Sequence, residues 1–363
     1  MEYNIIDMLW KVHKKGFSRI KREAVPLTIR EQTQEIQKNT LSQYACLSQN
    51  SRGREKEISE CPIRTPFARD RDRIIHCNAF RRLMHKTQVF LSPEGDHYRT
   101  RLTHTLEVNQ IAKTLAVALR LNEELVEAIA LGHDLGHTPF GHAGERALKE
   151  VCPYGFSHAE QSVRVVEEIE NGGVGLNLTW EVRNGIACHS YSNPSPEGRA
   201  KTLEGRVVYF ADKIAYLNHD IEDAIRAKVL DDDDIPWTIK YQLGRTKSQR
   251  ITALIDSIIQ NSRDDIRMDE KTASVFAEFN RFMHDAVYLN PVAKGEEGKA
   301  QAVVTSLYNY YVGHPQELPG EYRGIWEKTD AHRAVCDYIS GMSDRYAVTT
   351  YENLFIPKSW EVK

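Results

Sequence analysis

One fifteen-residue stretch, from Leu131 to Glu145, constrains this chain more than any other. It reads LGHDLGHTPFGHAGE, and its adjacent His133-Asp134 pair closes an apolar helical run. An imidazole and a carboxylate side by side offer the nitrogen and oxygen donors that divalent metals bind. A buried histidine–aspartate hydrogen bond would show the same two letters, so a metal site requires partners from elsewhere in the chain.

The bulk composition describes an ordinary globular chain whose 363 residues allow roughly two to three average domains or one large helical one. The formal net charge of -3 argues against a dedicated nucleic-acid binder, although local basic clusters could still hold phosphates. The six cysteines include no C-x-x-C pair, which indicates reduced thiols in a cytoplasmic protein. No apolar run approaches the ~20 residues of a membrane span, and the N-terminus shows no signal peptide.

Apolar periodicity predicts an all-α fold, with only a short strand signal at 349–351. Asn122 should cap a helix that the His133-Asp134 pair ends, and a capping box at Ser157–Glu160 should open another. Further helices are expected over 102–121, 142–151, 179–189, 203–230, 247–261, 269–286, 298–312 and 329–341. The first 60 residues are polar, and we expect a flexible tail over 1–25.

An amphipathic helix is also predicted from Ile74 to Lys86, with basic residues along one face. Two interpretations of this face stay open, because a solvated surface and a phosphate-binding surface have the same spacing.

Four candidate metal ligands fall on predicted buried helix faces. His104 lies on the apolar stripe of the helix over 102–121, and His133 and Asp134 end the next helix on its core-facing side. Asp212 lies on an otherwise apolar face, where a carboxylate is costly unless something binds it. Two imidazoles and two carboxylates would surround one divalent ion and leave positions open for water and a phosphate oxygen.

This H…HD…D order resembles the HD-domain metal-dependent phosphohydrolases. The blocks RTPFARDRDRIIHCNAFRRLMHKTQVF, GDHYRTRLTHTLEV, AIALGHDLGHTPFGHAGERAL, FSHAEQSVRVVE and ADKIAYLNHDIEDA resemble the deoxyguanosinetriphosphate triphosphohydrolase family. The late GMSDRYA, Gly341–Ala347, resembles the end of that family's sequences. The resemblance implies hydrolysis of a deoxynucleoside triphosphate (dNTP) to deoxynucleoside and inorganic triphosphate. It also implies an N-terminal arm and basic loop over 1–70, an HD core over 71–230 and a C-terminal helical region over 231–363.

Carried over by position, the resemblance assigns roles to individual residues. The implied metal ligands are His104, His133, Asp134 and Asp212. His142 is implied as the catalytic histidine and Glu145 as the carboxylate that orients it, which suits a pair three residues apart on a helix. The implied substrate contacts are Gln88, Arg101, His137, His158, Lys213, Tyr216 and Asp220, with Arg52 and Arg54 as further phosphate contacts. His189 and His219 are interpreted as core residues or supports of the ligands.

The metal is expected to be divalent: Mn²⁺ or Mg²⁺ by resemblance, while mixed N/O ligation also suits Fe²⁺, Co²⁺, Ni²⁺ or Zn²⁺. An allosteric dNTP site and a homo-oligomer, such as a hexamer, are expectations from the resemblance alone. Two rival interpretations remain open. One is another HD phosphohydrolase activity, a nucleotidase or a phosphodiesterase, and the other is a non-catalytic nucleotide sensor or weak single-stranded DNA binder.

Overall fold

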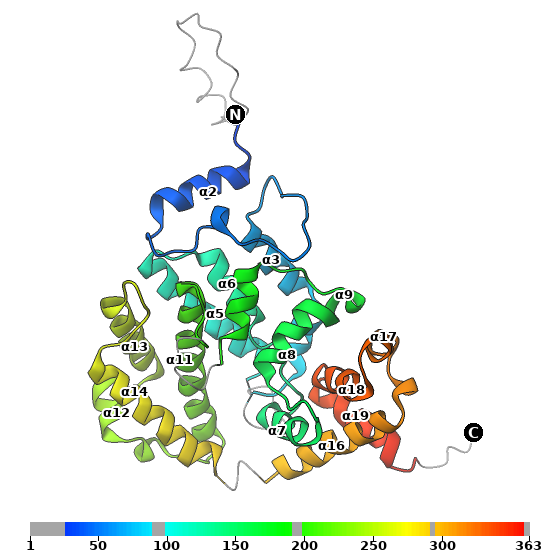
Figure 1. Ribbon diagram of the computed structural model, residues 1–363. Coiled ribbons are helices and arrows are strands. Elements are labelled where there is room, and N and C mark those ends of the chain that lie inside the picture. Colours follow the sequence, from blue (N-terminus) through cyan, green and yellow to red (C-terminus); the bar gives the residue numbers. More distant parts are fainter. Residues whose placement is uncertain (1–25, 89–98, 191–197, 291–294, 359–363) are drawn as a thin grey trace, which may run out of the picture.

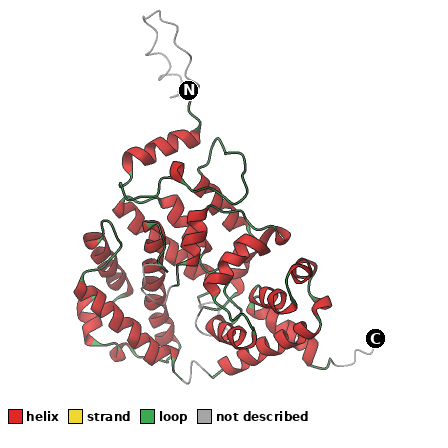
Figure 2. Ribbon diagram, in the orientation of Figure 1, coloured by secondary structure: helices red, strands yellow, loops and turns green. Residues whose placement is uncertain are grey.

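The computed structural model describes residues 26–88, 99–190, 198–290 and 295–358. In these ranges the fold is all-α, as predicted, and contains no strand (Figure 2). Two isolated bridges join Arg54 to Thr179 and Thr87 to Thr100. The tail expected over 1–25 lies outside the described residues.

The helices follow one another along the chain as α2 (Ile29–Thr40), α3 (Pro66–His76), α4 (Asn78–Arg82), α5 (Arg101–Leu119), α6 (Glu123–Gly132), α7 (Gly141–Val151), α8 (His158–Arg164), α9 (Glu170–Gly173), α10 (Trp180–Ala187), α11 (Leu203–Arg226), α12 (Trp237–Gln242), α13 (Lys247–Asn261), α14 (Glu270–Met283), α16 (Glu297–Gly313), α17 (Gly320–Lys328), α18 (Ala331–Ser340) and α19 (Asp344–Phe355). Short 3-10 turns occur at η1 (Ser48–Asn50), η2 (Leu83–His85), η4 (Asp232–Asp234) and η6 (Pro315–Glu317), and π-helical turns at η3 (Val165–Ile169) and η5 (His284–Tyr288).

Helices α5, α6 and α11 pack against one another at the centre of the molecule (Figure 1). Their facing residues, among them Val108, Ile129 and Ala211, are fully buried. Helices α12 to α14 flank α11 on one side, and α16 to α19 lie on the other side next to α7. The predicted apolar stripes therefore form one continuous core, with the histidine-rich segment between the centre and the C-terminal helices.

Two predicted helix starts have different outcomes. Asn122 caps α6 as expected, since its side chain accepts a hydrogen bond from the Leu125 amide at 3.3 Å. The capping box at Ser157 was wrong, because the Ser157 side chain makes no cap hydrogen bond. The Glu145 carboxylate of α7 accepts from the His158 amide at 3.0 Å instead. A charged acceptor from a neighbouring helix forms the stronger hydrogen bond.

Other local predictions also needed correction. The basic segment over 74–86 is interrupted at Cys77, whose extended backbone separates α3 from α4. Lys86 belongs to no solvated face, because only 2% of its surface is exposed. The short strand signal at 349–351 lies inside α19, where packing against α16 overrides the preference of β-branched residues. The polar arm contains a helix, α2, which a Thr28 capping box opens.

All six cysteines are free thiols. Among the described residues, no helix combines the length and apolar character that crossing a membrane requires.

The loop between α6 and α7 is held against α8 by a close backbone approach at Gly136. Its amide donates to Ser162 Oγ at 2.9 Å, and a Cβ added to this glycine would lie 2.2 Å from the Ser162 backbone nitrogen. Backbone cannot yield as a flexible side chain does, so any side chain at position 136 must separate the loop from α8.

We therefore predict that Gly136→Ala lowers the free energy of unfolding by about 1–3 kcal/mol, the usual cost of overpacking. The control is Gly324→Ala inside α17, where a Cβ meets no atom within 4 Å and should add about 0.5–1 kcal/mol of stability. Urea titration of both variants measures the difference. Equal stability of Gly136→Ala and the wild type would contradict the packing described for this loop.

Candidate active site

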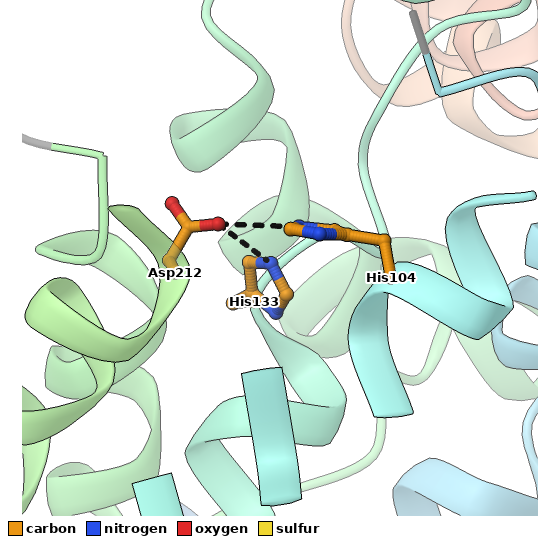
Figure 3. A group of neighbouring side chains, drawn as sticks. All are labelled: His104, His133 and Asp212. Atoms are coloured by element: carbon orange, nitrogen blue, oxygen red, sulfur yellow. Dashed lines mark ion pairs between the residues drawn. The ribbon is translucent and has the colours of Figure 1, made fainter. Parts of the chain in front are cut away.

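Three helices bring His104, His133 and Asp212 together at the centre of the molecule (Figure 3). His104 comes from the first turn of α5, His133 from the C-terminal end of α6 and Asp212 from the middle of α11. Asp212 Oδ1 lies 3.1 Å from His104 Nε2 and 3.8 Å from His133 Nε2. One ligand atom from each residue lies within 4.8 Å of the others, which is a spacing that one cation could bridge.

The orientation of His133 suits a metal ligand. Its Nδ1 lies 2.7 Å from the Ala130 carbonyl oxygen and must donate to it, so in the neutral ring the lone pair is on Nε2. That Nε2 is buried and has no hydrogen-bond partner. Unpaired buried polar atoms are rare in folded proteins, and a bound cation would satisfy this one. The two-nitrogen, carboxylate donor set fits a divalent cation.

Asp134 lies beside this cluster and is shared between two groups of neighbours. Its Oδ2 is 3.6 Å from His133 Nε2 and 3.8 Å from His104 Nε2, and it accepts from Arg101 Nη1 at 2.7 Å. Burial raises the pKa of Asp134, but the neighbouring charges of His133 and Arg101 outweigh burial and hold it well below its usual range. The carboxylate is therefore ionised and able to bind a cation.

Asp212, the second carboxylate, accepts a hydrogen bond from His104 that lowers its pKa. Burial alone would raise the pKa of Asp212, but this bond and the charges of His133 and His104 lower it to about 2. The bond needs a proton on His104 Nε2, and a cation bound there would displace that proton.

His219, on α11, supports the ring of His104 from behind. His104 Nδ1 and His219 Nε2 lie 2.9 Å apart, so the second nitrogen of the ligand is occupied within the protein. A partner of this kind fixes the orientation of a metal-binding imidazole. His219 Nδ1 also lies 2.6 Å from Asp220 Oδ1, although neither of these two atoms makes a hydrogen bond, and the other oxygen of Asp220 accepts from Tyr288 at 2.6 Å.

A cavity of about 740 Å³ opens beside these residues. Most of the predicted substrate contacts line it: Gln88, Arg101, His137, His158, Lys213, Tyr216 and Asp220, together with His142. Its volume suits a nucleotide-sized ligand. One part of the wall is basic and rich in histidine, while Tyr216, Asp220 and Tyr288 form another part.

Glu145 joins His142 and His158 at the histidine-rich wall. Its Oε2 lies 3.3 Å from His142 Nδ1, and its Oε1 lies 2.9 Å from His158 Nδ1. Burial raises the pKa of Glu145, but hydrogen bonds to both histidines reverse this and lower it far below its usual range. The predicted pairing with His142 is thus present but shared, and the shorter contact is to His158. The His142 side chain is 67% exposed, so its imidazole is accessible from the cavity.

His137 and His158 stack on each other, with ring centroids 4.7 Å apart. Burial and the positive charge of Arg101 hold the pKa of His137 well below its usual range. Burial also opposes charge on His158, but the hydrogen bond to Glu145 prevails and raises its pKa. The wall therefore combines a neutral imidazole with one that readily carries a proton.

The residues on α11 that face the cavity are held by neighbours, which come from the C-terminal half for Tyr216 and Asp220 and from α11 itself for Lys213. Tyr216 donates to Asn280 Oδ1 at 2.7 Å, and the Lys213 ammonium lies 2.6 Å from the Tyr209 hydroxyl and 4.4 Å from the centre of that ring. The Asp220 carboxylate accepts a hydrogen bond from the Tyr288 hydroxyl.

Arg52 and Arg54 do not line this cavity, contrary to the expected phosphate contacts. Arg54 forms a buried ion pair with Asp70 and donates to the Pro66 carbonyl at 3.0 Å, so its guanidinium is already neutralised inside the protein. Arg52 packs over the Trp180 ring, 4.0 Å from its centre. Within one chain, neither side chain is placed to meet a ligand in the cavity.

The sequence interpretation missed several wall residues. His189, interpreted as a core residue or a support of the ligands, is buried and also lines the cavity, with its Nε2 3.9 Å from Asp134 Oδ1. Tyr288 and the side chains of Asn280, Arg281 and His284 also line it. The usable signal was that His189 follows the end of a helix, as His133 does. In the structure, Nδ1 of each ring lies 2.7 Å from the carbonyl oxygen three residues earlier, Ile186 and Ala130 respectively. For α14 and η5, no motif marked the cavity-facing residues.

Comparison with known proteins adds independent findings. The HD domain family matches residues 101–217, and the phosphohydrolase-associated domain matches residues 266–353. A deoxyguanosinetriphosphate triphosphohydrolase-like protein of Caldanaerobacter subterraneus subsp. tengcongensis is 52% identical over 92% of this chain and 98% of its own length. Proteins with the same description from Clostridium perfringens and Desulfatibacillum aliphaticivorans are 48% and 47% identical, each covered over 99% of its length.

The HD match contains all four expected ligands, and the associated domain contains the segment that supplies Tyr288 and the GMSDRYA motif. The protein is therefore an HD-type hydrolase, and it belongs to the deoxyguanosinetriphosphate triphosphohydrolase-like family of HD proteins.

Proposed function

We propose that this protein hydrolyses deoxynucleoside triphosphates, dGTP or others, to the deoxynucleoside and inorganic triphosphate. The observation that carries the proposal is the position of the His104–His133–Asp212 cluster at the wall of a cavity of about 740 Å³, which is also lined by cationic, tyrosine and carboxylate side chains. The expected metal ligands are this trio and Asp134. Family membership and the description of the relatives agree with this substrate class.

A divalent cation bound by these residues would polarise a water molecule and a phosphate oxygen. Mn²⁺ and Mg²⁺ are the ions we expect to support activity in an assay. Arg101 and Lys213 bring positive charge to the same wall and would neutralise the triphosphate, with His137 and His158 as hydrogen-bond partners. Arg101 also holds Asp134 in place, so it serves the ligand and the substrate together.

The sugar is proposed to bind along α11. Tyr216 and Asp220 lie four and eight residues after Asp212, so the same helix face carries both the cation site and the sugar site. The Asp220 carboxylate can accept the 3′-hydroxyl, with Gln88 as a second partner, and the Tyr216 ring would cover the deoxyribose. This arrangement sets the distance between the sugar and the α-phosphorus, and positioning of this kind lowers the barrier of a phosphoryl reaction.

His142 is the proposed general acid. Water adds to the α-phosphorus while the bond from phosphorus to the 5′ oxygen breaks, and the departing oxygen needs a proton. His142 is exposed to the cavity, and the Glu145 carboxylate that contacts its Nδ1 orients the ring. His158 competes for the same carboxylate, so a proton held between these two histidines and Glu145 is available at the reacting end of the cavity.

Loss of a ligand should abolish binding of the cation. We expect Asp212→Ala to contain no bound Mn²⁺ after loading and desalting, as measured by elemental analysis. Asp223→Asn, on the same helix but hydrogen-bonded to Arg99 outside the cavity, serves as the control and should load like the wild type. Full metal loading of Asp212→Ala would remove Asp212 from the ligand set.

Loss of the general acid should affect turnover alone. We expect His142→Ala to lower kcat by about 10²–10⁴-fold, the range for general acid–base catalysis, with metal content unchanged. The matched control is His284→Ala, which removes another exposed, carboxylate-paired histidine of the same cavity and should retain most activity. If both variants lose the same amount of activity, His142 has no special role in proton transfer.

The products distinguish the proposed reaction from its rivals. We expect incubation of the Mn²⁺-loaded protein with each dNTP, alone and mixed, to yield deoxynucleoside and inorganic triphosphate on ion-exchange chromatography. Release of orthophosphate would indicate a nucleotidase instead. Salt-dependent binding of single-stranded DNA without turnover of any dNTP would indicate a binding protein.

Two further expectations have their own tests. The mixed incubation tests whether one nucleotide activates turnover of another, and light scattering tests whether the protein is a homo-oligomer.

A further inference from the structure

The turn between α18 and α19 reaches the histidine loop of the HD domain. Asp344, the first residue of α19, uses its carboxylate for contacts outside its own helix. Oδ1 accepts from the Phe140 amide at 2.9 Å, and Oδ2 accepts from the Thr87 amide at 3.0 Å and from the Thr87 hydroxyl. One side chain thus joins three segments that are far apart in the sequence.

The loop that receives Asp344 has an unusual backbone. Phe140 has φ of 61° and Gly141 has φ of 57°, both in the left-handed region. For a residue with a side chain this conformation is costly and persists only where surrounding contacts enforce it. Among the described residues, the Phe140 amide donates to Asp344 Oδ1 and to no backbone carbonyl, so it would be unpaired without this carboxylate. His142 and Glu145 follow directly in the first turns of α7.

Lys86 fixes the other end of the same loop. Its buried Nζ donates to the His137 carbonyl at 2.5 Å and to the Ser340 carbonyl, at the end of α18, at 2.8 Å. The loop from His137 to Phe140 is therefore tied at both ends to the α18–α19 turn. The segment that faces Gly141 is also fitted closely, because a Cβ at this glycine would lie 3.1 Å from the Gln88 carbonyl oxygen.

We propose that Asp344 is a positioning residue for His142: its carboxylate, together with Lys86, holds the loop over 137–140 and its left-handed turn at Phe140 and Gly141 in the conformation that directs α7 and His142 toward the cavity. This gives the phosphohydrolase-associated region a role in the reaction although Asp344 does not line the cavity. The expected kinetic effect rests on the proposed dNTP hydrolysis, but the expected effect on the loop does not.

The test compares Asp344→Ala with Asp330→Ala. Asp330 caps α18, where it accepts one backbone amide, from Arg333 at 3.1 Å, and one hydroxyl, from Tyr154 at 2.8 Å. It therefore matches Asp344 in chemistry and belongs to the same region, but its two partners lie outside the segment over 137–145. We expect Asp344→Ala to lower kcat for a dNTP by ~10–100-fold, the scale of small misplacements of catalytic groups, with KM and Mn²⁺ content unchanged. Asp330→Ala should keep the wild-type kcat.

Hydrogen–deuterium exchange, followed by mass spectrometry, measures the loop without requiring turnover. Asp344→Ala should accelerate exchange in peptides that cover 137–145, and Asp330→Ala should leave these peptides unchanged. Equal exchange in the two variants overturns the proposal, and so does accelerated exchange with wild-type kcat. If the wild-type protein hydrolyses no dNTP, the proposed function fails while the exchange comparison still decides whether Asp344 holds the loop.

Milder variants keep the test decisive if Asp344→Ala does not fold. Thr87→Val removes only the hydroxyl donor to Asp344, and Asp344→Asn replaces one acceptor oxygen with an amide that cannot accept. Each should give a smaller change of the same kind, with faster exchange over 137–145 and lower kcat at constant KM. Wild-type kcat and wild-type exchange in both would overturn the proposal.

Discussion

The cluster of His104, His133 and Asp212 is the constraint on which the structure depends. Three polar groups lie within an apolar packing of helices, where an isolated charge would be very costly. The protein offsets part of this cost through a hydrogen bond from His133 to Ala130 and one between His104 and His219, but His133 Nε2 stays unpaired. A bound cation would satisfy that atom, which gives a physical reason for a polar centre in the core.

The electrostatics of the cavity follow from how the remaining charges are shared. Arg101 donates a hydrogen bond to Asp134, and the Glu145 carboxylate is hydrogen-bonded to both His142 and His158. Few of these groups are free to change charge independently, because each is tied to a neighbour of opposite sign. His142 differs from the others, since its ring is largely exposed and has one moderately long contact. This exposure is the reason why we propose His142 as the group that gives a proton to the substrate.

The C-terminal region completes the centre from two directions. Tyr288 reaches Asp220 from beyond α14, and Asp344 reaches Phe140 and Thr87 from the start of α19. Tyr288 contacts the carboxylate of Asp220, which lines the cavity, and Asp344 contacts the backbone amide of Phe140, two residues before His142. The associated region thus contacts the rest of the protein through specific hydrogen bonds as well as by packing. The division of the chain near residues 70 and 230 stays a prediction.

The sequence by itself determined the fold class and the position of the proposed ligands along the helices. Helical periodicity is a local property, so it placed His104, His133 and Asp212 on buried faces and predicted α13 with its observed bounds, 247–261. What only the tertiary structure decided are contacts between distant segments. The sharing of Glu145 with His158, the burial of Lys86 and the use of Arg54 by Asp70 depend on which helices meet. Thr87 and Asp344 are 257 residues apart, and no local pattern can report a hydrogen bond between them.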